Sequence, residues 1–107
     1  MSDTIIKKIL PAMRAIVARK LIETYGLSQK QTAQKLGATQ PAISQYKRGI
    51  RGMKVDIITN YPKLSEMLET VAKKVASGEI ADEQVTIEFF KICEYLAAEG
   101  LFSKKSE

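Results

Sequence analysis

The sequence predicts an all-α fold of about five helices, forming one domain over the whole chain. Apolar residues recur three and four positions apart in three long stretches, which is the period of helices with one buried face. Gly26, Gly78 and Gly100 follow these stretches and indicate where the helices end. Two shorter helices are expected after the first stretch. Within the one domain, we distinguish a basic part, residues 1–54, from a helical packing part, residues 62–102.

The N-terminal residues are expected to form a short helical turn or arm that ends before Pro11. Proline removes a helix hydrogen-bond donor and pushes the residue before it away from helical geometry. The lysine pair of this segment would suit a basic arm, whereas its isoleucines favour burial, which we prefer. The first long helix should then run from Pro11 to about Tyr25.

Residues 28–49, SQKQTAQKLGATQPAISQYKRG, have the pattern of two short helices joined by a glycine turn. Ser28 is the predicted cap of the first helix, and Gln31, three residues on, is its capping-box partner. Gly37 suits the left-handed backbone that ends this helix, and Thr39 can cap the second one. The segment is therefore a predicted helix-turn-helix.

The spacing of six residues in this segment is similar to the phage Cro/repressor type of helix-turn-helix: Gln29, Ala33, Gly37, Gln40, Ile43 and Tyr46. In that family the small residue at the Ala33 position lets the two helices approach, and the aliphatic residue at the Ile43 position locks the second helix into the core. The resemblance implies that Gln40 and Gln45 contact bases and that Gln29 stands at a phosphate-contacting helix start.

Positive charge is concentrated in the part of the chain that contains this motif. Residues 1–54 hold eleven Lys and Arg against two acidic residues, a net charge of +9, while residues 55–107 have a net charge of −4. A basic half is the electrostatic signature expected of a protein that binds a polyanion. Because the charge coincides with the motif, we favour binding to double-stranded DNA over an unevenly charged surface without function.

The predicted DNA-binding residues are Pro41 and the polar and cationic residues on the outward side of the motif and just after it: Gln29, Thr39, Gln40, Ser44, Gln45, Lys47, Arg48, Arg51 and Lys54. The amides of Gln40 and Gln45 offer the paired donor and acceptor that suit adenine, and the cations would hold phosphates. Pro41 departs from the family pattern, so the first turn of the second helix should read fewer bases. The stretch after Gly49 is expected to be a loop, with one short helix inside it as an option.

Two further helices are expected, from Lys63 to Ser77 and from about Asp82 to Gly100. The apolar residues of the last helix cover more than one face, which indicates a subunit interface in addition to a core. A core within the monomer alone is the alternative, with equal weight. The predicted dimer contacts are Phe89, Phe90, Cys93 and Leu96.

Other classes of function find no support in the sequence. It has no histidine, and the single Cys93 cannot complete a disulfide or a metal site, so we expect no metal ion and no cofactor. We find no catalytic motif and expect no enzyme. An apolar run long enough to span a membrane and a signal peptide are both lacking, which favours a cytoplasmic, nucleoid-associated protein.

The sequence therefore predicts a sequence-specific, DNA-binding transcriptional regulator that acts as a homodimer, with its second motif helix in the major groove. The alternative is an antitoxin-like or adaptor module that grips another protein and contacts DNA only secondarily. The stretch from Ile9 to about Gly52 also resembles, more loosely, the N-terminal part of a group of archaeal helix-turn-helix regulators.

Overall fold

The structure, a computed structural model, describes the backbone of residues 3–49 and 61–99 and the side chains of residues 9–45 and 61–99. Five helices occupy these ranges: α1, Asp3–Glu23; α2, Gln29–Leu36; α3, Gln40–Gly49; α5, Pro62–Ser77; and α6, Asp82–Ala98. The predicted all-α fold is confirmed for the described part of the chain. The loop expected after Gly49 and the helix end expected at Gly100 lie outside it.

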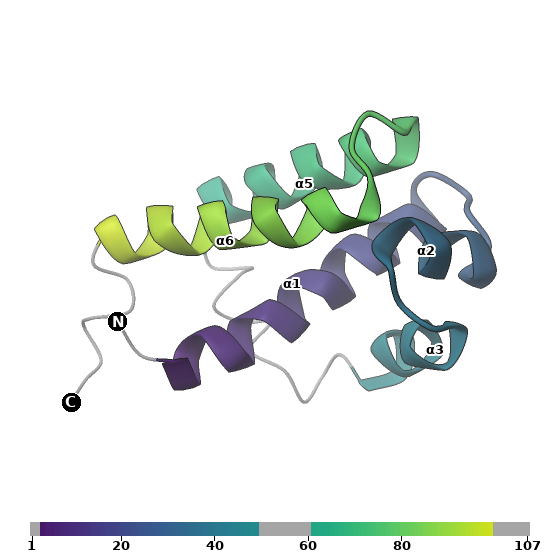
Figure 1. The fold of residues 1–107 in the computed structure, drawn as a ribbon, viewed down its shortest axis with the longest axis horizontal. Coiled ribbons are helices and arrows are strands. Elements are labelled where there is room, and N and C mark those ends of the chain that lie inside the picture. The colour runs from purple at the N-terminus through teal and green to yellow at the C-terminus, as the bar shows by residue number, and fades with distance from the viewer. Residues whose placement is uncertain (1–2, 50–60, 100–107) are drawn as a thin grey trace.

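Helix α1 is the central element of the fold (Figure 1). All four other described helices pack against it. Helices α5 and α6 form an antiparallel pair along one side, while α2 and α3 gather at the end where α1 finishes (Figure 1). The predicted helix-turn-helix, α2 and α3, thus lies at one end of the described structure and packs against the other three helices, α1, α5 and α6.

The buried apolar side chains of the five helices form a single core cluster. Helical spacing places them on the inner face of each helix, as the sequence pattern predicts. The largest fully buried members are Phe89, Ile9, Met13, Leu21, Ile43, Leu64, Leu68, Val17, Val75 and Val85. Since each such side chain contributes about 1.5–3 kcal/mol by leaving water, this cluster dominates the stability of the fold.

The predicted helix boundary at Pro11 is wrong, because α1 runs without interruption from Asp3 to Glu23 with Pro11 inside it. An interior proline costs a helix about 3 kcal/mol. Ile9, Ala12 and Met13, on either side of the proline, are fully buried in the core. Their packing offsets the lost hydrogen bond, and the segment before Pro11 continues the helix instead of forming a separate turn or arm.

Helix α6 begins at Asp82, as expected, with Ala81 at the N-cap position. A methyl group cannot accept a hydrogen bond, so the cap is supplied from inside the helix. The Ala81 N–H donates to Gln84 Oε1 at 2.9 Å, and the Glu83 N–H donates to Asp82 Oδ1 at 2.8 Å. Gly78, in the left-handed conformation with φ 82°, ends α5 as predicted.

Three of the four predicted dimer contacts cannot reach a partner. Phe89, Cys93 and Leu96 are 0%, 2% and 4% exposed, because their spacing puts them on the face of α6 that packs into the core. Phe90, one position on, is 46% exposed and is the only member of the set that offers surface to another chain. Burial also raises the pKa of the Cys93 thiol, as expected for a structural cysteine.

Candidate nucleic-acid interface

The start of α2 has the predicted capping box. The Gln31 N–H donates to Ser28 Oγ at 3.0 Å, and the Ser28 N–H donates to Gln31 Oε1 at 2.9 Å. Helix α2 buries Thr32, Ala33 and Leu36 on its inner side. These contacts set the orientation of α2 on the core and leave its N-terminal turn at the surface.

The turn between α2 and α3 is built on Gly37, which has φ 66° and ψ 34°. The Ala38 N–H donates to the Ala33 carbonyl at 2.9 Å, a bond that closes the end of α2. A Cβ atom at Gly37 would lie 3.0 Å from Asp82 Oδ2 and 3.3 Å from Asp82 Cβ. The turn therefore needs glycine for two reasons: its backbone conformation and its close packing against the start of α6.

Gly37→Ala is expected to lower the free energy of unfolding by about 2–3 kcal/mol, the sum of left-handed strain and crowding against Asp82. Gly78→Ala is the matched control, because Gly78 has the same backbone conformation and no atom within 4 Å of the added Cβ. It should cost only about 1–2 kcal/mol. Urea denaturation of both variants measures the difference, and equal losses would show that the contact with Asp82 is unimportant.

Helix α3 is capped by Thr39, whose Oγ1 accepts from the Ala42 N–H at 3.2 Å. Ile43 is fully buried, and α3 packs against α1 and α2. Among the described side chains of α3, Ile43 alone is buried. The side chain of Tyr46, the last residue of the family spacing, lies outside the described residues.

The structure describes six of the predicted DNA-binding side chains. Thr39, Gln40, Pro41 and Gln45 are exposed, and Gln29 and Ser44 are half-buried: the set spans the start of α2 and the outer side of α3. The side chains of four cations are outside the described residues: Lys47, Arg48, Arg51 and Lys54. All six described members are thus at least partly accessible to solvent.

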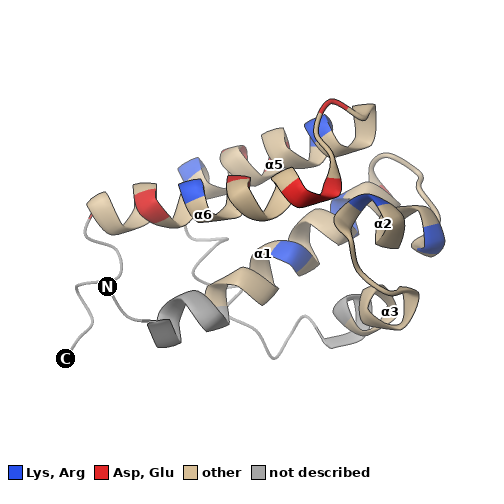
Figure 2. Cartoon of the chain, in the orientation of Figure 1, with Lys and Arg blue, Asp and Glu red and all other residues tan. Residues whose placement is uncertain are grey.

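Charges are unevenly distributed over the molecule (Figure 2). Lys30 is exposed one residue after Gln29, and the sequence reasoning missed it, although its place in the first turn of a motif helix was a signal. By contrast, Lys20 forms an ion pair with Glu69 at 2.8 Å. The Lys20 ammonium is therefore engaged within the chain.

Arg14 of α1 also has a structural role. Its guanidinium donates to Thr86 Oγ1 at 3.2 Å, and its Cζ lies 5.6 Å from the centre of the Phe89 ring. These contacts join α1 to α6 on the side of the core that faces the helix-turn-helix. Only part of the positive charge counted in the sequence is therefore available to a polyanion.

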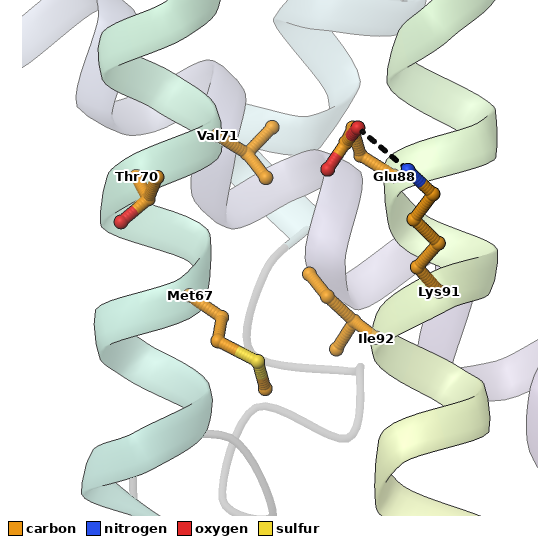
Figure 3. A pocket seen from close by; sticks show the side chains of 6 residues that line it. All are labelled: Met67, Thr70, Val71, Glu88, Lys91 and Ile92. Carbon is orange, nitrogen blue, oxygen red and sulfur yellow. Dashed lines mark ion pairs between the residues drawn. The ribbon is translucent and has the colours of Figure 1, made fainter.

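A hollow of about 220 Å³ lies between α5 and α6. Figure 3 shows that Met67 and Ile92 point toward one another across it and that Glu88 and Lys91 pair along its α6 side, at 3.6 Å. Three of the six lining residues are apolar and three are polar or charged: Met67, Val71 and Ile92, and Thr70, Glu88 and Lys91. The hollow has no arrangement of nucleophile and base that would suit catalysis.

None of the helices in residues 3–49 and 61–99 combines the length and apolar character needed to cross a bilayer. Over the same part of the chain, no three His, Cys, Asp or Glu side chains gather in a way that could hold a metal ion.

A comparison with known protein families finds a match for the segment that contains α2 and α3. Residues 19–59 match the family model described as helix-turn-helix. The match begins near the end of α1 and contains α2 and α3 entirely. Searches of curated proteins and of solved structures returned no match to the chain.

Proposed function

Because residues 19–59 belong to the Cro/repressor type of helix-turn-helix, we propose that the protein is a sequence-specific, double-stranded DNA-binding regulator of transcription. The observation that carries this proposal is the arrangement of α3. Ile43 anchors the helix to the core, while Gln40, at the start of the helix, and Gln45, on the side opposite Ile43, are exposed. A rigid helix with exposed amides is suited to reading base edges.

In this proposal α3 enters the major groove and α2 crosses the phosphate backbone. The side-chain amides of Gln40 and Gln45 each provide one donor and one acceptor group, which match adenine N7 and the N6 amino group. Thr39 caps α3 through Oγ1, and Pro41 has no N–H, so the first turn of α3 supplies fewer polar groups than its second turn. Ser44 adds a hydroxyl that can donate or accept.

Phosphate contacts would fix the position of α3 on the duplex. The start of α2 offers unpaired N–H groups and the positive end of the helix dipole, and Gln29 and Lys30 stand there. Four more cations extend along the chain from α3, at positions 47, 48, 51 and 54. Each phosphate that is neutralised releases counterions, so affinity should fall steeply with salt.

A homodimer is part of the proposal for a quantitative reason. One small helix-turn-helix buries too little surface to discriminate strongly among sequences. Two copies related by a two-fold axis would read half-sites about 34 Å apart, one turn of the DNA helix. Doubling the contact in this way multiplies the discrimination that each half-site provides.

The test is selection of bound duplexes from a random library at near-physiological salt, followed by titration of the selected site with variants. Gln45→Ala should relax the preference at one position of each half-site and cost about 1–3 kcal/mol there. Lys47→Ala should instead weaken all duplexes alike and lower the salt slope by about one.

Gln34→Ala is the control, since Gln34 is an exposed glutamine of α2 on the side away from Gln29. It should leave both the base preference and the salt slope unchanged. If the library shows no enriched sequence, sequence-specific binding is ruled out. Affinity that does not depend on salt would contradict the phosphate contacts.

The second candidate, an antitoxin-like or adaptor module, rests on Ile87 and Phe90, two large apolar side chains exposed on α6. In that case the exposed side of α6 would hold a different protein, and the chain alone would be monomeric. The two candidates are therefore distinguished by what binds this side of α6: a second copy of the chain or a different protein.

A further inference from the structure

The outer side of α6 is unusually apolar for an exposed helix. Ile87 is 53% exposed, Phe90 46% and Tyr95 36%, and they are three of the five large apolar side chains exposed in the described residues. Lys91, Glu94 and Ala98 are exposed beside them. We name these six residues the α6 outer face: Ile87, Phe90, Lys91, Glu94, Tyr95 and Ala98.

The α6 outer face is one continuous strip. At about 100° per residue, its six members fall within about 140° of the helix circumference. The opposite side of α6 carries Val85, Phe89 and Ile92, which are buried in the core. The apolar residues of the strip therefore do not contribute to the core of one chain. An exposed apolar strip of this kind is typical of a surface that another molecule covers.

We infer that the α6 outer face packs against the same face of a second copy of the chain, with the two helices antiparallel about a two-fold axis near residues 92 and 93. This inference rests on the proposed function, for which it supplies the dimer interface. Two-fold contacts are self-complementary, so the strip must match its own reverse. That condition can be checked residue by residue.

The antiparallel register about this axis pairs complementary groups. Lys91 of one chain lies at the same height as Glu94 of the other, and the symmetry makes this ion pair twice. Ile87 meets Ala98 in the same way, near the centre line of the strip. Phe90 and Tyr95 lie at its two opposite edges and flank the contact on either side. Other registers pair these residues less well. If the two-fold axis passed at the height of Glu94, the two Glu94 carboxylates would oppose one another. If it passed between Phe90 and Lys91, the apolar Ile87 would lie at the height of the charged Glu94.

The size of the strip indicates a weak dimer. A single helix face of this length buries roughly a few hundred Å² per partner, less than the roughly 800 Å² of a standard interface. Dimerisation should therefore depend on concentration, in the micromolar range or above. Two adjacent half-sites on DNA would raise the effective concentration of the second copy and complete the dimer there.

Charge reversal tests the register. Sedimentation equilibrium of the full chain without DNA should show a monomer and dimer in exchange. Lys91→Glu sets four carboxylates together at the interface, and Glu94→Lys sets four ammonium groups there, so each single variant should dimerise at least tenfold more weakly. An equimolar mixture of the two should recover dimerisation, because each reversed residue then meets its opposite.

Recovery in the mixture is the result that a merely structural effect cannot produce. Lys91 pairs with Glu88 in its own chain, but its side chain is 66% exposed, so this pair contributes little to folding. Circular dichroism melts should confirm that both variants are folded. Phe90→Ser should also weaken the dimer, and Tyr25→Ser, which removes an exposed aromatic residue at the end of α1, should not.

The inference is overturned if the wild-type chain stays monomeric at protein concentrations about ten times above the micromolar range. It is also overturned if the chain forms a dimer that neither single charge reversal weakens. A mixture that stays monomeric rejects this register. Failure of the proposed function has a different signature: a dimer that responds to reversal as expected but binds no duplex. Monomeric variants that still bind one half-site, without cooperativity on two, support both.

Discussion

Phe89→Ala is expected to lower the free energy of unfolding by about 3–5 kcal/mol, the largest loss from any single substitution considered. Phe89 is fully buried in the core cluster, and its ring also lies under the Arg14 guanidinium. Alanine leaves a cavity that neighbouring helices fill only in part. For a domain of this size, each kcal/mol corresponds to about 4–8 °C in melting temperature, so thermal and urea denaturation will both detect the change.

Phe90→Ala is the matched control, because the same residue type is changed one position along α6. Phe90 is exposed, so its removal should change the stability of the monomer by less than about 1 kcal/mol. Both variants should be measured at low protein concentration, where dimerisation adds nothing to apparent stability. Equal losses would contradict the orientation of α6, because a rotation of about 100° would exchange the two side chains.

Ile43→Ala is expected to cost about 2–5 kcal/mol of stability and, in addition, most of the DNA affinity. Ile43 is the one buried residue among the described side chains of α3. Shortening it removes the contact that holds α3 against α1 and α2. The helix carrying Gln40 and Gln45 would then lose its fixed orientation, and reading base edges depends on that orientation.

The two effects can be separated by measuring DNA affinity at a temperature where circular dichroism shows the variant still folded. Phe89→Ala serves as the comparison, since it destabilises the core at a distance from α3. At equal fractions folded, Ile43→Ala should bind the selected site far more weakly than Phe89→Ala. Equal affinities would mean that Ile43 acts only through global stability.

The local features of the helix-turn-helix were predictable because they depend on residues close in sequence. The capping box at Ser28, the left-handed Gly37 and the Thr39 cap each join atoms within three or four residues. The exposed state of Gln45 likewise follows from helical periodicity once Ile43 is placed inward, whereas Gln40 is exposed at the first position of the helix. Four of the six described residues of the proposed DNA-binding surface are exposed and two are half-buried, and their contact with DNA stays a prediction.

Other predictions failed where distant residues decide the outcome. Pro11 would end a helix judged by local preference alone, yet the burial of Ile9 and Met13 against other helices keeps α1 continuous. Counting the lysines and arginines of the basic part could not show that Arg14 contacts Thr86 and Phe89, more than seventy residues away in the sequence. Long-range packing is weakly encoded in any short window of sequence.

The last helix shows the same division. Its sequence indicated an excess of apolar residues, but could not say which of the adjacent Phe89 and Phe90 faced the core. The neighbouring α1 and α5 decide this by packing against one side of α6. Only with that orientation known does the α6 outer face emerge, with a charge pattern that matches its own reverse.

By itself, the sequence determined that this protein is helical, where the helix-turn-helix lies and which of its residues could face DNA, because periodicity, caps and turns act over a few residues. Tertiary structure alone decided the continuity of α1, the close contact of Gly37 with Asp82 and the rotation of α6. Each of these depends on which surfaces of distant helices exclude water together, and the free energy of that burial exceeds local preference.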